Sequence, residues 1–278
     1  MSRNAMSLKA KIKNYAKVTK LPAQVVLQNY MFECFLNRLS SSKYQEKFVI
    51  KGGVLIASIV GLDTRATMDL DTTIRNLPLT EEKIIDALNE VCNIDKSDSI
   101  IFEIKGIESI RKDDIYGGYT VKLIAIYDTI NTPLNIDIST GDVITPSPIQ
   151  YELVGLFDES LSIRLWGYNI ETVLAEKVET ILSRGVFTTR PKDFYDIYIL
   201  CTTQQFSKKL FQDALVATAT HRGTLERISR TDDIINDISK NKELINNWVK
   251  YQKQFDYAKT ISYESIIEMI KMLLRNYK

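Results

Sequence analysis

The sequence predicts an α/β (α+β) fold in which a mixed β-sheet flanked by helices is followed by a helical C-terminal half. Strand-like apolar runs recur at residues 48–50, 68–74, 100–107, 119–127 and 134–139. Between them lie a helical run at 80–92, which Thr80 can cap, and turn residues at 111–114. Beyond residue 165 apolar residues instead recur at helical spacing, and the last four helices are expected at 211–220, 225–238, 243–257 and 263–277. We therefore expect a sheet-bearing core at residues 1–165 and a helical C-terminal domain at residues 166–278.

Composition places the chain among globular proteins. Apolar residues make up 45% of its 278 residues, and the net charge of +1 argues against a surface built throughout for nucleic acid, while leaving room for basic patches. No run of eighteen apolar residues occurs, and the first residues lack the apolar core of a signal peptide. We expect a cytoplasmic protein that does not associate with membranes.

Cysteine and histidine usage limits the available chemistry. The cysteines are odd in number, far apart and embedded in apolar segments, which predicts free thiols in a reducing compartment. They are Cys34, Cys92 and Cys201. His221 is the single histidine, which argues against histidine-based metal clusters and catalytic triads.

Two helices are expected before the first strand. Residues 3–20 contain six basic residues and no acid, and from about Ser7 the apolar residues take helical spacing. Two interpretations of this basic helix stay open: a solvated docking helix, or an arm that contacts RNA phosphates. The next helix begins near Pro22 and carries a core-facing apolar stripe, so it supports the sheet without chemistry.

A glycine turn at residues 51–53 is the centre of the predicted site. Residues 48–50 read as the end of a buried strand, and residues 54–60 as a short apolar helix. Gly52 and Gly53 have no Cβ, so an anion can approach the backbone N–H groups at the positive end of the helix dipole. We expect a triphosphate there, with the Lys51 ammonium available to neutralise it.

Two aspartates follow on the next predicted strand. Because side chains alternate along a strand, Asp69 and Asp71 lie on one face, with roughly 7 Å between their Cα atoms. Two such carboxylates can hold one or two magnesium ions. Alternatively, a surface strand carries two acids for solubility alone.

A glycine pair after a strand, then a helix, then a strand with Asp-x-Asp resembles the polymerase-beta-type nucleotidyltransferase superfamily. The longer runs at residues 48–53 and 62–71 resemble the AbiEii/AbiGii branch, the toxin half of bacterial type IV toxin–antitoxin pairs that act in abortive infection and phage defence. The similarity runs from about Val25 to Leu200. It implies a nucleotidyltransferase fold for the mixed sheet. One departure is Gly53, because the superfamily usually has a serine there whose hydroxyl contacts phosphate.

The resemblance also implies a third carboxylate on a neighbouring strand. Asp137 is our candidate, because it lies between Ile136 and Ile138 as the superfamily pattern requires, and Asp142 is the competing choice. With Asp69 and Asp71, it would hold two magnesium ions and act as the base for an acceptor hydroxyl.

Two further site candidates lie in the helical half. Lys177 falls inside the apolar stripe of a helix that begins after Asn169 and ends at Gly185, so its ammonium needs a carboxylate or a phosphate, unless it extends to the edge of the core. The segment 176–180 resembles the lysine motif of the toxin family, which favours phosphate. Asp193 begins a further helix in a block at 190–196 that resembles the last motif of the family, with Asp196 as a weaker candidate. This half is expected to complete the active-site cleft.

The predicted function is magnesium-dependent nucleotidyl transfer. The resemblance implies GTP as the preferred nucleoside triphosphate, the 3′ end of a tRNA as the acceptor, and a companion antitoxin that need not touch the toxin. Two alternatives stay open: a small-molecule nucleotidyltransferase of the antibiotic-adenylylating type, and a non-catalytic nucleotide-binding module, which would explain the missing hydroxyl at Gly53.

Overall fold

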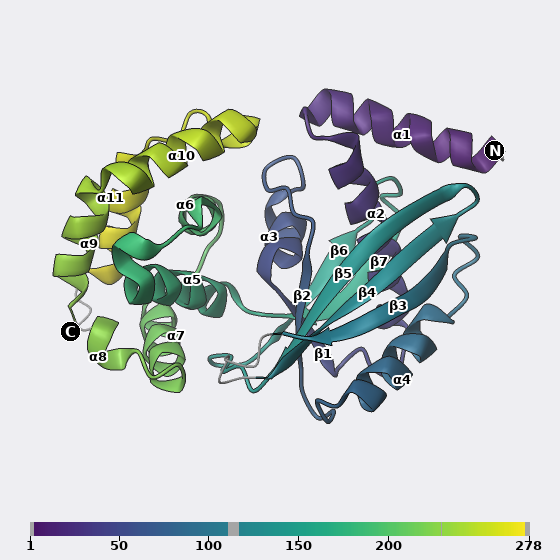
Figure 1. Ribbon diagram of the computed structural model, residues 1–278, viewed down its shortest axis with the longest axis horizontal. Coiled ribbons are helices and arrows are strands. Elements are labelled where there is room, and N and C mark those ends of the chain that lie inside the picture. Colours follow the sequence, from purple (N-terminus) through teal and green to yellow (C-terminus); the bar gives the residue numbers. More distant parts are fainter. Residues whose placement is uncertain (1–2, 111–116, 229, 276–278) are drawn as a thin grey trace. The chain divides into compact units, whose positions relative to one another are not determined.

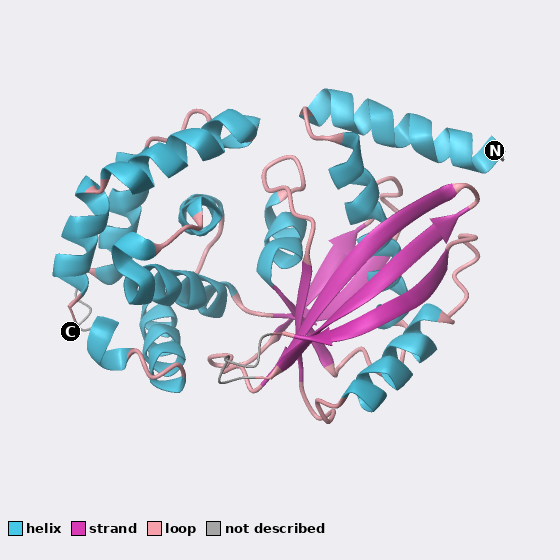
Figure 2. Ribbon diagram, in the orientation of Figure 1, coloured by secondary structure: helices cyan, strands magenta, loops and turns pink. Residues whose placement is uncertain are grey.

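The computed structural model describes residues 3–110, 117–228 and 230–275. The chain divides into two compact units, one formed by Met1–Asp142 with Ile149–Gly167 and the other by Val143–Pro148 with Tyr168–Lys278. Among the described residues, all strands belong to the first unit, while the second unit is helical (Figure 2).

The first unit contains a seven-stranded sheet with the order β3-β4-β5-β2-β1-β7-β6 (Figure 1). Its strands are β1 Phe48–Lys51, β2 Leu70–Ile74, β3 Ile101–Ser109, β4 Gly118–Tyr127, β5 Ile130–Thr140, β6 Ile149–Val154 and β7 Ser162–Gly167. The pairs β2–β5 and β1–β7 are parallel, and the other neighbours are antiparallel. The sheet is therefore mixed, as the sequence predicted.

Helices cover one face of this sheet. They are α2 Ala23–Ser40, α3 Gly52–Val60 and α4 Glu81–Cys92, while α1 Arg3–Thr19 packs on α2. The Thr80 side chain caps α4, as predicted. Along β5 the even-numbered side chains are buried and the odd-numbered ones are more exposed. The buried face is the one under α2, because α2 contacts β5 and β7 and its Phe35 ring packs edge-on against Phe102 of β3. The opposite face carries the polar side chains.

A buried arginine ties α2 to the start of β3. Arg38 is 2% exposed, and its guanidinium donates to both carboxylate oxygens of Asp98 at 2.7 Å and to the Ile100 carbonyl at 2.8 Å. The same guanidinium lies over the Phe102 ring. Because every one of these partners is fixed in the fold, the ion pair sets the position of β3 relative to α2.

The sequence analysis missed the strands β6 and β7. Neither strand was among the predicted runs, yet β7 lies inside the sheet, where it pairs with β1 across more than a hundred residues of chain. Parallel pairing at that sequence distance has no local signal. The structure also begins β2 at Leu70 where the pattern predicted residue 68, and the turn predicted at 111–114 lies outside the described residues.

The second unit consists of helices. They are α5 Ile170–Arg184, α6 Pro191–Thr203, α7 Lys208–His221, α8 Leu225–Ile228, α9 Thr231–Lys240, α10 Lys242–Gln254 and α11 Tyr263–Leu274, with short 3₁₀ turns at Gly185–Phe187 and Asp256–Ala258. The Asn169 side chain caps α5, and Gly185 ends it with φ +54°, both as predicted. The single helix expected at 225–238 is wrong, because the chain forms α8 and α9 there.

The described core contains a buried tryptophan and free thiols, and the latter confirm the sequence prediction. Trp248 is 2% exposed, stacks on Tyr251 and donates to the Ile261 carbonyl, so it is a packing residue. The cysteines are all free; two are buried and Cys201 is half-buried. None of the helices in the described part of the chain combines the length and the apolarity needed to span a bilayer.

Candidate active site

The glycine turn lies between β1 and α3 in the first unit. Gly52 is the first residue of α3 and has φ +64°, in the left-handed region that favours glycine. A Cβ at this position would stand 1.9 Å from Oδ2 of Asp71. Glycine is therefore required twice, for the backbone angle and for the close approach of the Asp71 carboxylate to the helix start.

Four polar side chains form a row across neighbouring strands, which we call the polar row: Lys51, Asp71, Asp137 and Thr120. The strand register pairs Lys51 of β1 with Asp71 of β2, Asp71 with Asp137 of β5, and Asp137 with Thr120 of β4. Directly paired residues point to the same face of a sheet and have Cα atoms about 5 Å apart. Asp71 and Asp137 thus share the face opposite α2, beside Gly52.

Hydrogen bonds hold both ends of the polar row. The Thr120 hydroxyl donates to Oδ1 of Asp137 at 2.6 Å. At the other end, the Lys51 ammonium donates to the Ser139 hydroxyl at 2.8 Å and to Oδ2 of Asp142 at 2.5 Å. Asp142 therefore forms an ion pair with Lys51, and Asp137 lies opposite Asp71 in the strand register.

Asp69 lies differently from the other two aspartates. It is exposed and precedes the first residue of β2. Within the described ranges, no three side chains of aspartate, glutamate, histidine or cysteine lie close enough together to hold a metal ion. The structure thus brings Asp71 and Asp137 together, and the role of Asp69 stays a prediction.

The loop before Asp69 is held by α2 and packs on the glycine turn. The Gln28 amide donates to the Met68 carbonyl at 2.8 Å, and the Asn29 amide donates to the Thr67 carbonyl at 2.7 Å. A Cβ at Gly53 would stand 2.3 Å from the Thr67 hydroxyl oxygen. Gly53 therefore has a packing role, and the superfamily's serine would not fit here without movement of Thr67.

Lys177 lies in the second unit, on α5, between two carboxylates of α6. Its ammonium is 2.8 Å from Oδ1 of Asp193 and 2.7 Å from Oδ2 of Asp196. The side chains of these three residues are 14%, 6% and 0% exposed, respectively. Lys177 therefore does not extend to the edge of the core, and we call the three residues the lysine cluster.

Another side of α5 makes a second ionic contact in the same unit. Glu179 is 2% exposed, and its Oε2 accepts from Arg222, 2.5 Å away, while the Thr224 hydroxyl donates to its Oε1 at 2.8 Å. Arg222 also pairs with Glu176 at 2.9 Å. The segment 176–180 is thus held on both sides, by α6 through Lys177 and by the residues after α7 through its two glutamates.

Sequence reasoning missed two residues that position the predicted ones. Thr120 orients Asp137, and Ser139 bridges Lys51 and Asp142. A signal for Ser139 existed, since it alternates with Asp137 on one strand face. Thr120 had none, because only the antiparallel register of β4 and β5 places it opposite Asp137.

The sheet topology and the paired carboxylates beside a glycine turn define the class of protein: this is a nucleotidyltransferase fold. A crystal structure from H. pylori described as a candidate nucleotidyltransferase is similar at 17% identity and a TM-score of 0.54, covering 92% of this chain and 97% of its own. JHP933 from Helicobacter pylori is similar at 16% identity and a TM-score of 0.50, covering 91% and 93%. At such identities the likeness shows the fold alone.

The chain belongs to the AbiEii nucleotidyl transferase toxin family of type IV toxin–antitoxin systems, because the model of that family matches residues 34–268. None of the curated proteins matches it. The family match confirms the resemblance seen in the glycine turn and the Asp-x-Asp strand. It also extends past Leu200, where the sequence analysis found no similarity.

Proposed function

We propose that this toxin is a magnesium-dependent nucleotidyltransferase that transfers a nucleotide from GTP to the 3′ end of a tRNA. The observation that carries the proposal is the pairing of Asp71 with Asp137 beside Gly52. This brings acidic oxygen ligands next to the start of a helix, where a phosphate is stabilised by backbone N–H groups. The choice of GTP and of tRNA rests on the resemblance alone, and the family match implies a cognate antitoxin, which we propose acts without direct contact.

The donor set fits magnesium, because Asp71 and Asp137 offer carboxylate oxygens from adjacent strands, and Asp69 is close by in sequence. We propose Asp71 and Asp137 as ligands on this geometry, and Asp69 as the third on the family resemblance, since the described structure does not bring it to the other two. When bound, Mg²⁺ supplies positive charge to the triphosphate and lowers the pKa of the acceptor hydroxyl. Asp137 takes the proton of that hydroxyl at Oδ2, since Thr120 donates to its Oδ1.

The turn residues bind the phosphates. The N–H groups that follow Gly52 and Gly53 at the start of α3 approach the triphosphate, and Lys51 is held beside the carboxylate pair by Ser139 and Asp142. In the helical unit, we propose that Lys177 also binds phosphate and that Asp193 holds its ammonium in place. The family's lysine motif supports the first of these roles.

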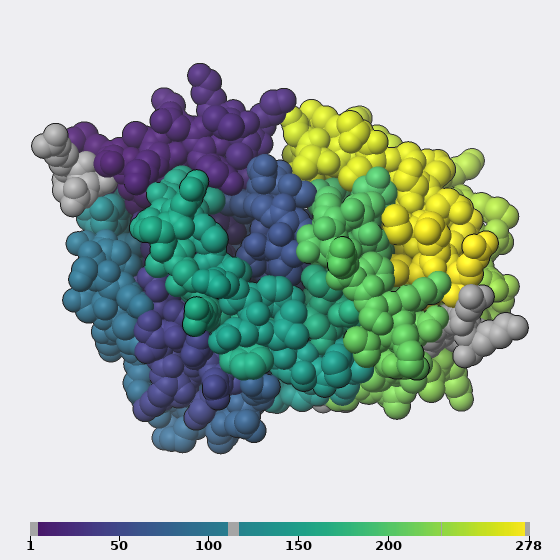
Figure 3. All heavy atoms as spheres, turned by 180° about the vertical axis from the view of Figure 1, so that it is seen from behind, coloured from purple at the N-terminus to yellow at the C-terminus, as the bar shows by residue number. Residues whose placement is uncertain are grey.

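A basic helix supports RNA as the acceptor. Leu8 and Ile12 of α1 are buried, while its lysines are exposed and no acid occurs among residues 3–20. The exposed lysines are Lys9, Lys11, Lys13, Lys17 and Lys20. The helix lies on the surface, as the space-filling view shows (Figure 3), so its lysines can contact phosphates of a polynucleotide.

The test uses purified protein, radiolabelled nucleoside triphosphates and total cellular RNA, with and without a chelator. We expect a discrete labelled RNA band that needs magnesium and is lost in Asp71→Asn and Asp137→Asn. Asp86→Asn on α4 is the matched control, because its carboxylate is 56% exposed and lies on another element, so transfer should persist. Label only on small molecules would overturn the RNA acceptor, and retained transfer in Asp71→Asn would overturn the site.

A further inference from the structure

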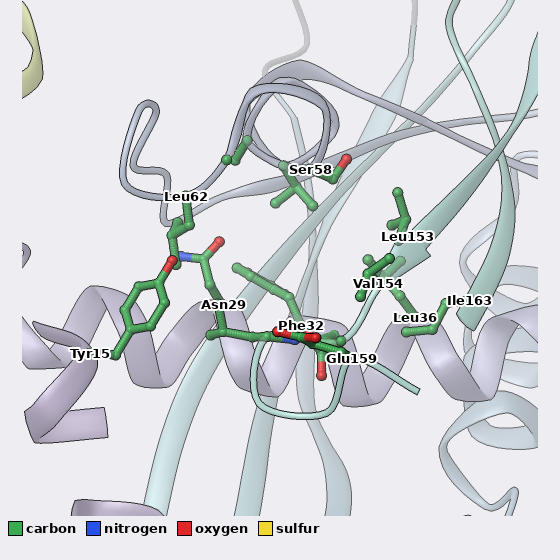
Figure 4. Close-up of a pocket in the computed structure, with 16 residues that line it drawn as sticks. Tyr15, Asn29, Phe32, Leu36, Ser58, Leu62, Leu153, Val154, Glu159 and Ile163 are labelled. Atoms are coloured by element: carbon green, nitrogen blue, oxygen red, sulfur yellow. The ribbon is translucent and has the colours of Figure 1, made fainter. Parts of the chain in front are cut away.

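A cavity of about 590 Å³ opens in the first unit, separate from the polar row (Figure 4). It lies between α2, the C-terminal half of α3 and the β6–β7 hairpin, with Tyr15 of α1 at one end. Its size is within the range of sites that hold small organic molecules. All of its lining residues belong to one compact unit, so the cavity is a feature of that unit alone.

The walls are packed and largely apolar. Phe32, Leu36 and Val54 form the inner wall and are buried, and Ile163 of β7 adds to it. The hairpin loop that closes the cavity is anchored by Phe157, whose ring packs edge-on against Tyr15 at 6.0 Å between centroids. An apolar ligand body would therefore meet preformed walls.

The charged side chains that line this cavity are carboxylates, and the neutral polar ones are Tyr15, Asn29 and Ser58. Glu33 on α2 lies at the wall, and its Oε2 accepts from the backbone N–H of Leu156, 2.5 Å away. Glu159 lies exposed at the mouth. None of the described residues that line the cavity is lysine, arginine or histidine. The lining thus offers negative charge with no compensating cation.

Burial of Glu33 has a measurable consequence. Desolvation raises the pKa of its carboxyl to about 7, and the Leu156 N–H only partly offsets this. A carboxylate kept at an apolar wall costs folding free energy unless a cation or further donor meets it. Titratable groups that face Glu33 or its surroundings are Tyr15, Tyr30, Cys34, Asp158 and Glu159, and the Lys11 ammonium acts on Asp158.

We propose that this cavity binds a small organic cation, an amine attached to an apolar body, with the ammonium against the Glu33 carboxylate. The apolar walls take the body, and the Glu33 carboxylate, with no lysine, arginine or histidine among the described lining residues, selects a donor of positive charge. The site is independent of the transfer chemistry, since it shares no residue with the polar row or the lysine cluster.

The test is a titration of the full-length protein by protein-observed NMR with phenethylamine, and with phenethyl alcohol as the neutral analogue of nearly the same shape. Because a hydrogen bond between charged groups stabilises a complex more than one between neutral groups, the amine should bind at least about tenfold more tightly than the alcohol. Glu33→Gln should remove that difference and leave alcohol binding unchanged. Glu82→Gln is the matched control, because its carboxylate is 79% exposed on α4 and lines no part of the cavity.

Proton linkage gives a second readout. Only the ionised Glu33 binds an ammonium, and with its pKa about 7 the ionised fraction rises about tenfold from about pH 6 to about pH 8. Amine affinity should rise by that factor, while alcohol affinity stays level.

Ser58→Phe, at the exposed mouth, should block both probes without disturbing the core. The proposal is overturned if neither probe saturates, if both bind equally, or if Glu33→Gln leaves the amine's preference intact.

Discussion

Replacing Lys177 tests the lysine cluster most directly. The Lys177→Met change keeps most of the side-chain volume and removes the ammonium that lies 2.8 Å from Asp193 and 2.7 Å from Asp196. Two carboxylates, 6% and 0% exposed, then lose their shared cation. Because neither can turn to solvent in place, the free energy of unfolding of the helical unit must fall.

The magnitude follows from burial. Removing one partner of a buried ion pair costs about 3 to 5 kcal/mol, and little solvent screening applies at these exposures. Asp193 lies in the first turn of α6, where the helix dipole still stabilises its carboxylate by about 0.3 to 1 kcal/mol and so reduces the loss. We expect Lys177→Met to lower the free energy of unfolding by about 3 to 4 kcal/mol. Asp196→Asn should cost less, because the pair with Asp193 survives.

The assay is urea unfolding followed by tryptophan fluorescence. The chain has two tryptophans, and Trp248 lies in the helical unit, so a Trp166→Phe background reports that unit alone. Lys209→Met is the matched control, since its side chain is 85% exposed and its ion pair spans 3.9 Å; it should change the free energy of unfolding by less than about 0.5 kcal/mol.

A loss below about 1 kcal/mol for Lys177→Met would refute this reasoning, because no desolvated carboxylate pair would then depend on the lysine. The double variant Lys177→Met with Asp196→Asn adds a check. Its loss should be smaller than the sum of the single losses, since one of the stranded charges is also gone. Nucleotide affinity measured on the folded variants then reports phosphate binding separately from stability.

Three further outcomes are expected. Gly52→Ala should destabilise the first unit by about 2 kcal/mol or more in thermal or urea unfolding, because of its left-handed φ and the nearby Asp71 carboxylate. Gly106→Ala is the control and should be nearly neutral, since an added Cβ there meets nothing within 4 Å. Equal effects of the two substitutions would contradict the role assigned to Gly52. The pKa of Glu33 is raised from 4.5 to about 7 in the folded state, so its contribution to the free energy of unfolding falls as the pH rises through that window. Glu33→Gln should therefore be more stable than the parent by about 1 to 3 kcal/mol at about pH 8, and no more stable at about pH 4. Burial raises the pKa of all three cysteine thiols to about 12, so a thiol reagent at about pH 8 should modify them slowly in the folded protein and rapidly in urea. Fast labelling of the folded chain would show that the thiols are not buried.

The elements with local signals were predictable from sequence. Thr80 and Asn169 mark helix starts because their side chains cap the next turn, and Gly185 marks a helix end because it takes a positive φ. The alternation of Ile136, Asp137 and Ile138 was likewise enough to assign the faces of β5, since the pleat imposes it on any strand with one buried side.

Long-range pairing decided what the sequence could not. β7 joins the sheet through β1, and Thr120 reaches Asp137 through the β4–β5 register, so neither follows from nearby residues. Tertiary structure also placed Asp137 opposite Asp71 and Asp142 in an ion pair with Lys51, and it placed Lys177 between two carboxylates. The sequence by itself determined which residues carry charge and which face of an element they occupy. The register and packing of elements far apart in the chain determined which charges meet, because the interaction of buried charges depends on distances of a few ångströms that only the folded chain sets.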